Sequence, residues 1–228
     1  TCQQRKIRHQ IISTAFLKFR RKVITPNQKR SFTLTAEGQS DSNIRRIFTT
    51  GFQSEWKSTM ERQLLAISPK ARLLSVDYGK NPKDYQAAPI KITFRYEIPD
   101  YALRGEGEMF FRPMVMNNLY NQVRSYIWID TSVENRKYGF KDGCSRLVEL
   151  DETIQLPAGY KLVSAAKDET MQGVGADFEG SLVQKGNKVL LHNRLALKKR
   201  VYEASDWESF RNAVNAHKAY GEYLVIKK

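Results

Sequence analysis

Alternation of apolar and polar residues constrains this chain more than any other feature of its sequence. Over residues 89–98 every second side chain is apolar or aromatic, while those between are charged or hydroxylated. Successive side chains of a strand point to opposite faces, so this period predicts a strand with one buried face. Similar alternation recurs at 31–37, 72–78 and 146–156. Gly186-Asn187 predicts a tight hairpin between two further strands, because these residues accept positive φ.

Two segments instead have the three- and four-residue spacing of a helix. The first runs from about 43 to 67, where apolar side chains return to one side until Pro69 ends the pattern. The second covers about 206–217, and Ser205 and Glu208 are predicted to form a capping box at its start. Strands neighbour strands without steady helical alternation. This order predicts an α+β class, mostly antiparallel β, with a sandwich-like domain, one long helix and one short C-terminal helix.

Positive charge is concentrated at the N-terminus. The chain has 38 Lys+Arg and 24 Asp+Glu, a formal charge of +14, and residues 1–30 carry +9 of it without any acidic residue. Residues 31–228 carry the other +5. A strong positive charge is typical of proteins that bind nucleic acid or a membrane surface, but here it belongs to a short segment. We therefore expect a basic arm or linker over 1–30 and a single β-rich domain over 31–228.

The basic arm also has a weak helical pattern. Its apolar residues at three- and four-residue steps are Ile7, Ile11, Ile12, Phe16 and Phe19. An amphipathic helix at an anionic surface, a helix packed on the body, and a leader foreign to the domain all fit this pattern. The candidate anion contacts are Arg5, Lys6, Arg8, Lys18, Arg20, Arg21 and Lys22.

The sequence contains no P-loop, no dinucleotide-binding fingerprint, no paired Cys-x-x-Cys and no His-Glu-x-x-His. Its two cysteines, Cys2 and Cys144, cannot form a disulfide framework and are expected to be free thiols, with a single bridge as the alternative. Cys144 and His192 with a carboxylate would make a nucleophilic set if the pKa of the thiol were lowered. A packed or exposed structural thiol is the other interpretation. We expect no cofactor and no metal ion.

Two carboxylate pairs occupy alternate positions in predicted strands, Glu149 with Asp151 and Asp177 with Glu179. Members of each pair share one strand face, which is compatible with a glycosidase-like acid and base or with a solvated face. Tyr and Trp are not gathered with Lys and Arg, so specific binding of single-stranded nucleic acid is not predicted.

From residue 30 onward the order of features resembles a known family. The opening strand at 32–38 reads as a Leu-x-Leu-like pattern ending in Gly, and 156–160 reads Leu-Pro-Ala-Gly-Tyr. Segments 205–211 and 223–228 are similar to a closing helix and strand. Together they resemble the C-terminal β-rich domain of unknown function that follows the core of bacterial transglutaminase-like, cysteine-protease-fold proteins.

This resemblance implies an accessory domain beside a transglutaminase-like core, often in an extracytoplasmic setting such as the periplasm or cell envelope. The family's catalytic Cys, His and Asp belong to that core, and no segment here matches the motifs around them. The resemblance thus implies a non-catalytic interaction domain whose partner is the neighbouring core domain, with contacts on exposed strand faces and loops such as 135–143. Polyanion or anionic-membrane binding through residues 1–30 is the alternative, and a thiol hydrolase using Cys144 is a third.

Overall fold

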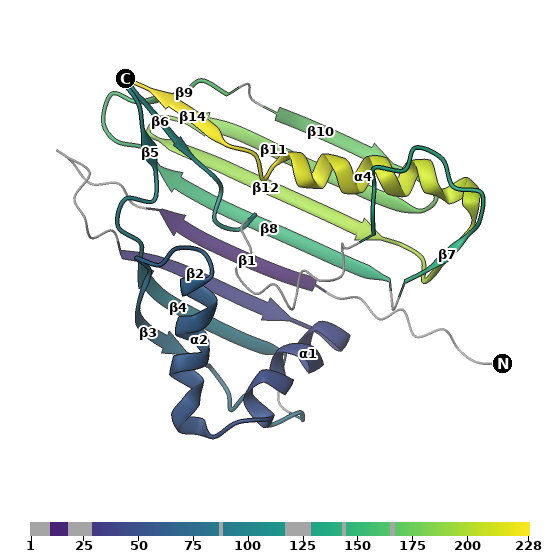
Figure 1. Cartoon of the computed structure of the whole chain (residues 1–228), viewed down its shortest axis with the longest axis horizontal. Helices are drawn as coiled ribbons and strands as arrows, with labels where there is room; N and C mark the ends of the chain where they lie inside the picture. Colours follow the sequence, from purple (N-terminus) through teal and green to yellow (C-terminus); the bar gives the residue numbers. More distant parts are fainter. Residues whose placement is uncertain (1–9, 18–28, 87–88, 117–128, 143–144, 165–166) are drawn as a thin grey trace.

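The computed structural model describes residues 10–17, 29–86, 89–116, 129–142, 145–164 and 167–228. Eight strands form one large, mostly antiparallel sheet (Figure 1). In spatial order they are β10 (Lys167–Gln172), β11 (Ala176–Lys185), β12 (Lys188–Leu197), β8 (Arg146–Gln155), β1 (Gln10–Leu17), β2 (Lys29–Ala36), β4 (Ile90–Glu97) and β3 (Arg72–Asp77).

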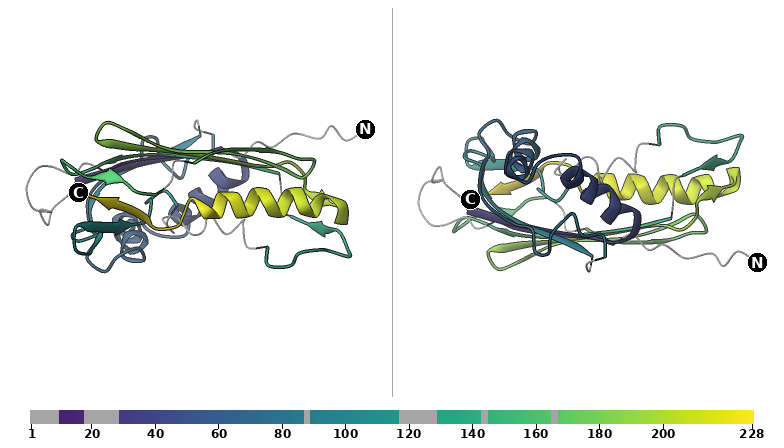
Figure 2. Two further views of the ribbon diagram at one scale, coloured as in Figure 1. Left: turned by 90° about the horizontal axis from the view of Figure 1, so that it is seen from above. Right: turned by 90° about the horizontal axis from the view of Figure 1, so that it is seen from below.

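A smaller sheet and a strand pair complete the described β structure. The smaller sheet consists of β5 (Leu103–Arg104), β6 (Glu108–Phe111), β14 (Leu224–Lys227) and β9 (Lys161–Leu162). The strand pair consists of β13 (Val201–Tyr202) and β7 (Phe140–Lys141). The helices are α1 (Gly38–Thr49), α2 (Trp56–Leu65) and α4 (Trp207–Ala219), with single turns η1 (Gln53–Glu55) and η2 (Ala204–Asp206). Figure 2 shows the helices and the smaller sheet on one side of the large sheet. The predicted α+β class is confirmed.

The core lies between the large sheet and the elements on that side of it. The alternation predicted for β4 is confirmed, since Ile90, Ile92 and Phe94 are buried while Lys91 and Arg95 are exposed. Burial of such apolar area stabilises the fold by about 25 cal/mol per Å².

Helix α4 packs closely against β11 because β11 has a glycine at the point of contact. A Cβ atom at Gly180 would lie 2.6 Å from the Tyr220 ring, so any larger residue would push the helix end away. The hairpin between β11 and β12 is also confirmed, with Gly186 at a φ of 60°. Glycine adopts this left-handed conformation without steric cost.

The single long helix predicted over 43–67 is wrong, because two helices occupy that segment. Phe52 is extended (φ −75°, ψ 151°), and its N–H donates to the Glu55 carboxylate at 3.0 Å. The break lets Phe48 and Trp56 meet edge to face at 5.2 Å, while the Trp56 indole N–H donates to the Phe48 carbonyl at 3.2 Å. Phe52, which the helical pattern placed on the buried side, is 77% exposed.

The helix considered for residues 1–30 is also wrong where the structure describes this segment. Gln10–Leu17 is strand β1, antiparallel to β2 and parallel to β8. This stretch contains Ile and Thr, which favour strands, and no charged residue. Residues 1–9 and 18–28 lie outside the described part of the chain. The segment expected to be a peripheral arm therefore contributes an inner strand of the large sheet.

The start of α4 differs from the predicted capping box. Asp206 is the N-cap residue of α4, but its side chain makes no cap hydrogen bond to that helix. Its carboxylate instead accepts the Glu203 N–H at 2.9 Å at the start of turn η2, and the Lys199 ammonium at 2.6 Å. Ser205 and Glu208 are exposed. Among the described helices, none combines the length and apolar character needed to cross a membrane.

Candidate functional site

His192 lies on the face of the large sheet that the helices leave open. Its Nδ1 is 2.7 Å from the Asp151 carboxylate of β8, which is the carboxylate partner that a nucleophilic set requires. Cys144, the predicted nucleophile, lies outside the described residues. Ser181 is the register partner of His192 on β11, but β11 is paired with strands on both sides. The backbone N–H groups around Ser181 are used in the sheet ladders and are not free to stabilise an oxyanion.

At least one member of each predicted carboxylate pair contacts a basic side chain on the same open face. Glu149 accepts a hydrogen bond from Arg194 at 3.1 Å, and Asp177 lies 2.6 Å from the Lys198 ammonium. Cross-strand ion pairs of this kind are typical of a solvated sheet face and favour that interpretation over a glycosidase-like pair.

The seven candidate anion contacts of the N-terminal segment lie outside the described residues. They are Arg5, Lys6, Arg8, Lys18, Arg20, Arg21 and Lys22. Their role therefore stays a prediction. Among the residues that the structure does describe, no three His, Cys, Asp or Glu side chains are grouped so as to hold a metal ion.

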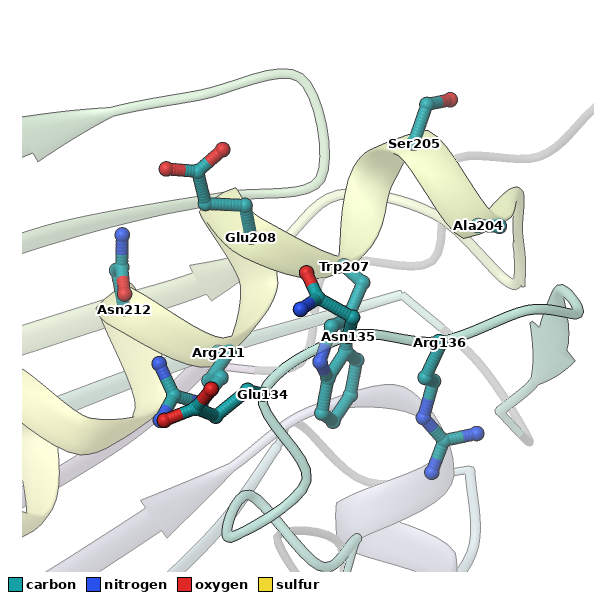
Figure 3. A pocket seen from close by; sticks show the side chains of 9 residues that line it. All are labelled: Glu134, Asn135, Arg136, Ala204, Ser205, Trp207, Glu208, Arg211 and Asn212. Atoms are coloured by element: carbon teal, nitrogen blue, oxygen red, sulfur yellow. The ribbon is translucent and has the colours of Figure 1, made fainter.

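A polar pocket lies at the N-terminal end of α4 (Figure 3). Its volume is about 410 Å³, and it is formed between the loop that precedes β7 and the first turns of the helix. In the view of Figure 3, Glu134 and Asn135 of the loop lie next to Arg211 and Trp207 of α4, while the Arg136 side chain extends away from the helix. The lining residues are Glu134, Asn135, Arg136, Ala204, Ser205, Trp207, Glu208, Arg211 and Asn212.

The loop is held against α4 by hydrogen bonds from helix side chains to loop oxygens. The Trp207 indole N–H donates to the Val133 carbonyl at 3.0 Å, and Arg211 Nε donates to the Thr131 carbonyl at 3.0 Å. Lys218 Nζ donates to the Thr131 hydroxyl at 3.0 Å. Bonds spread over three turns of one helix fix the loop along its length, so the pocket wall is preorganised.

Phe140, Tyr202 and Trp207 form an aromatic cluster next to the pocket. Phe140 stacks on Tyr202 at 4.6 Å with an interplanar angle of 5°, and it meets Trp207 edge to face at 5.5 Å. The Arg136 guanidinium lies 4.4 Å from the Trp207 ring centroid and 4.8 Å from that of Phe140. Cation–π contact with two rings at once fixes the position of this cation.

Burial and hydrogen bonding shift several pKa values around this end of the molecule. Burial raises the pKa of Tyr202 to about 12. The hydrogen bond from Lys199 is the main cause of a lowered pKa at Asp206. Hydrogen bonds from Ser132 are the main cause of a lowered pKa at Asp130, and Lys218 and Arg136 add smaller effects. The carboxylates of Asp130 and Asp206 are therefore already stabilised as anions by their own neighbours.

Large apolar side chains are exposed at this end of the molecule, on segments next to those that line the pocket. Val133 is 42% exposed, Tyr138 72%, Val174 69% and Val201 58%. Val174 belongs to the same end because the N–H of the next residue donates to Ser209 of α4 at 3.0 Å. We call Val133, Tyr138, Val174 and Val201 the apolar rim. A rim of this kind beside a rigid pocket is a common feature of protein interaction sites.

The sequence indicated only part of this site. It pointed to the loop at 135–143 as a contact region, and the pocket uses Asn135 and Arg136 of that loop. It did not predict that Trp207 of α4 would stack on Arg136, because the two residues lie 71 positions apart. No local pattern reports such a pairing.

The fold and the pocket define an α+β domain in which the loop before β7 is hydrogen-bonded to helix α4. Residues 107–225, just over half of the chain, match a family described as "Domain of Unknown Function with solved-structure structure" (DUF3858). The chain belongs to this family. The matched segment runs from just before β6 into β14, so it includes the pocket and the apolar rim.

Beyond the family, the similarity found is to a solved structure and covers about half of the chain. No curated protein matches the chain. A crystal structure described as a "putative protease" from Parabacteroides distasonis is similar over 54% of this chain, with 12% sequence identity and a TM-score of 0.44. The similar region is 24% of the length of that protein's chain.

Proposed function

We propose that this chain is a non-catalytic accessory domain that docks on the transglutaminase-like core of a larger protein. The apolar rim is the observation that carries the proposal. Four large apolar side chains exposed at one end would cost free energy in water, and covering them on a partner recovers about 25 cal/mol per Å². The sequence resemblance supports an accessory role, and the match to a family of unknown function is compatible with it.

Hydrogen exchange in the longer protein tests this proposal. We expect the amides of the loop 131–141 and of β13 to exchange more slowly when the upstream core is present than in residues 1–228 alone. Equal exchange in the two proteins would exclude docking through this end. Covering by a partner is the reason to expect protection, because exchange requires access of water to the amide.

Charge substitutions sharpen this test. Tyr138→Glu and Val201→Asp should weaken association with a separately produced core on the order of tenfold each, since a charge would be buried at the interface. Phe52→Glu is the matched control, because Phe52 is at least as exposed as Tyr138 and Val201 but belongs to the break between α1 and α2. An equal effect of all three changes would argue against the apolar rim.

Polyanion binding through residues 1–30 is a second proposal, supported by the +9 charge of that segment. Deleting the segment would also remove strand β1, so substitution is the cleaner test. Arg20→Gln, Arg21→Gln and Lys22→Gln together should shift heparin elution to lower salt, because fewer counterions are released. Unchanged elution would end this proposal.

A further inference from the structure

Arg136 is an arginine with a fixed orientation at the edge of the pocket. Its guanidinium is held 4.4 Å from the Trp207 ring and 4.8 Å from the Phe140 ring. Trp207 is itself fixed by its hydrogen bond to the Val133 carbonyl. The planar fork of arginine matches a carboxylate with two parallel hydrogen bonds, and a fork held in place loses little conformational entropy on binding.

In the described part of the chain, no carboxylate forms a direct ion pair with Arg136. None of the ion pairs found there includes it, and its Nε is buried without a hydrogen-bond partner. Arg136 contributes slightly to the lowered pKa of Asp130, but the Asp130 carboxylate is already hydrogen-bonded to the Ser132 N–H at 2.9 Å. A partly buried guanidinium without a directly paired carboxylate is costly, so a carboxylate that pairs with it would be stabilised here.

The pocket beside Arg136 is polar and large enough to admit a side chain together with the peptide on either side of it. Its volume of about 410 Å³ is near the lower end of ordinary ligand pockets. Asn135 and Asn212 offer amides, and Ser205 offers a hydroxyl. These groups can hydrogen-bond to the peptide backbone on either side of a bound side chain.

The charges of the lining exclude a ligand of high negative charge. Arg136 and Arg211 are balanced by Glu134 and Glu208, so the lining has no net charge. Figure 3 shows the Glu208 carboxylate pointing away from Arg136. One carboxylate placed at Arg136 avoids both glutamates, whereas a phosphate-rich polyanion would meet them.

We propose that this pocket receives an aspartate or glutamate side chain from a loop of the docked partner, with Arg136 as its ion-pair partner. The apolar rim then packs around that loop. This inference rests on the proposed function and adds the chemistry of the partner's contact. Arg136 would supply specificity, because a partner without the carboxylate would leave the fixed guanidinium unpaired.

The test uses blocked single residues as probes and the chain itself as the receptor. N-acetyl-glutamate N-methylamide is titrated while the Trp207 indole N–H and the Arg136 Nε–H are followed by NMR. We expect saturable shifts with a dissociation constant on the order of 10 mM, the affinity of one charge-assisted contact. The neutral glutamine analogue should produce none. No saturable shift up to about 100 mM, or equal shifts with the glutamine analogue, would overturn the proposal.

Variants and a second anion complete the experiment. Arg136→Gln should abolish the shifts, and Arg136→Lys should weaken binding on the order of tenfold, because lysine keeps the charge but loses the fork. Arg194→Gln is the matched control, since Arg194 lies on the open sheet face. Binding of inorganic phosphate as tight as that of the glutamate probe would instead identify a general anion site and contradict the proposal.

Measurements on the protein that contains the core domain distinguish failure of this inference from failure of the proposed function. If the core protects the apolar rim from hydrogen exchange and Arg136→Gln leaves that association unchanged, docking stands and the carboxylate contact fails. If the glutamate probe binds but the core gives no protection, the pocket chemistry stands without this partner. Failure of both measurements removes both proposals.

Discussion

Tyr202 and Tyr220 show how much a single buried group depends on its neighbours. Both rings are buried in aromatic contacts, and burial raises the pKa of both hydroxyls. The Tyr202 hydroxyl accepts the Lys199 N–H at 3.3 Å. The Tyr220 hydroxyl is buried without a hydrogen-bond partner in the part of the chain that the structure describes. The same side chain should therefore contribute differently to stability at the two positions.

Tyr220→Phe is expected to change the free energy of unfolding by less than about 0.5 kcal/mol, or to increase it, because a buried hydroxyl without a partner is unfavourable. Tyr202→Phe should lower it by about 1 kcal/mol, because the Lys199 N–H loses its acceptor. Urea denaturation at pH 7 measures both changes. A loss of more than about 1 kcal/mol in Tyr220→Phe would show that its hydroxyl has a partner.

The same two hydroxyls predict weaker folding in alkali. The pKa of Tyr202 is about 12 in the folded chain, against 10.0 for an unperturbed tyrosine, so its contribution is complete below pH 10 and is lost as the pH rises towards 12. One such group changes stability by about 1.4 kcal/mol per pH unit in this window. Denaturation between pH 9 and pH 11.5 should show a smaller decline in a Tyr202→Phe, Tyr220→Phe double variant. Equal declines would contradict the assignment.

At the scale of elements, residues outside the regular pattern decide where helices begin and end. A continuous helix over 43–67 satisfies the periodicity of the sequence, yet the extended Phe52 divides it and lets Phe48 and Trp56 pack together. Before α4, in place of the predicted box of Ser205 and Glu208, the Asp206 carboxylate accepts the Glu203 N–H at the start of turn η2. In both places a tertiary or charged contact outweighs the local preference.

Asp206→Ala should lower the free energy of unfolding by about 1–2 kcal/mol, because turn η2 loses its cap hydrogen bond and Lys199 loses its ion-pair partner. Ser205→Ala is the control and should change it by less than about 0.5 kcal/mol, because Ser205 is exposed. Thermal or urea unfolding at pH 7 distinguishes them. Since the pKa of Asp206 is lowered, its contribution is present above the unfolded pKa of 3.8 and is lost as pH falls further. A larger effect at Ser205 would restore the predicted capping box.

At the scale of the whole molecule, β1 joins the two halves of the large sheet. On one side β2, β4 and β3 pair in sequence, and on the other β8, β12, β11 and β10 do. Among the described strands, β1–β8 is the parallel pair, and the others are antiparallel. The family match begins at residue 107, so β1 pairs with the family segment from outside it.

Deletion of residues 1–28 should lower the unfolding midpoint and cause self-association, because β2 and β8 would then expose unpaired edges. Deletion of residues 1–9 is the control, since it leaves β1 in place. Differential scanning calorimetry and light scattering measure the two effects. Equal behaviour of the two deletions would show that β1 is dispensable.

The sequence by itself determined which residues form most strands, which faces they bury, the β11–β12 hairpin and the position of α4. These properties depend on neighbours in the chain, through side-chain alternation and turn chemistry. The tertiary structure alone decided the place of β1, the break at Phe52, the partner of His192 and the stacking of Arg136 on Trp207. Each of these joins distant residues or depends on packing between them, so it follows from sheet register and close contact rather than from any local pattern.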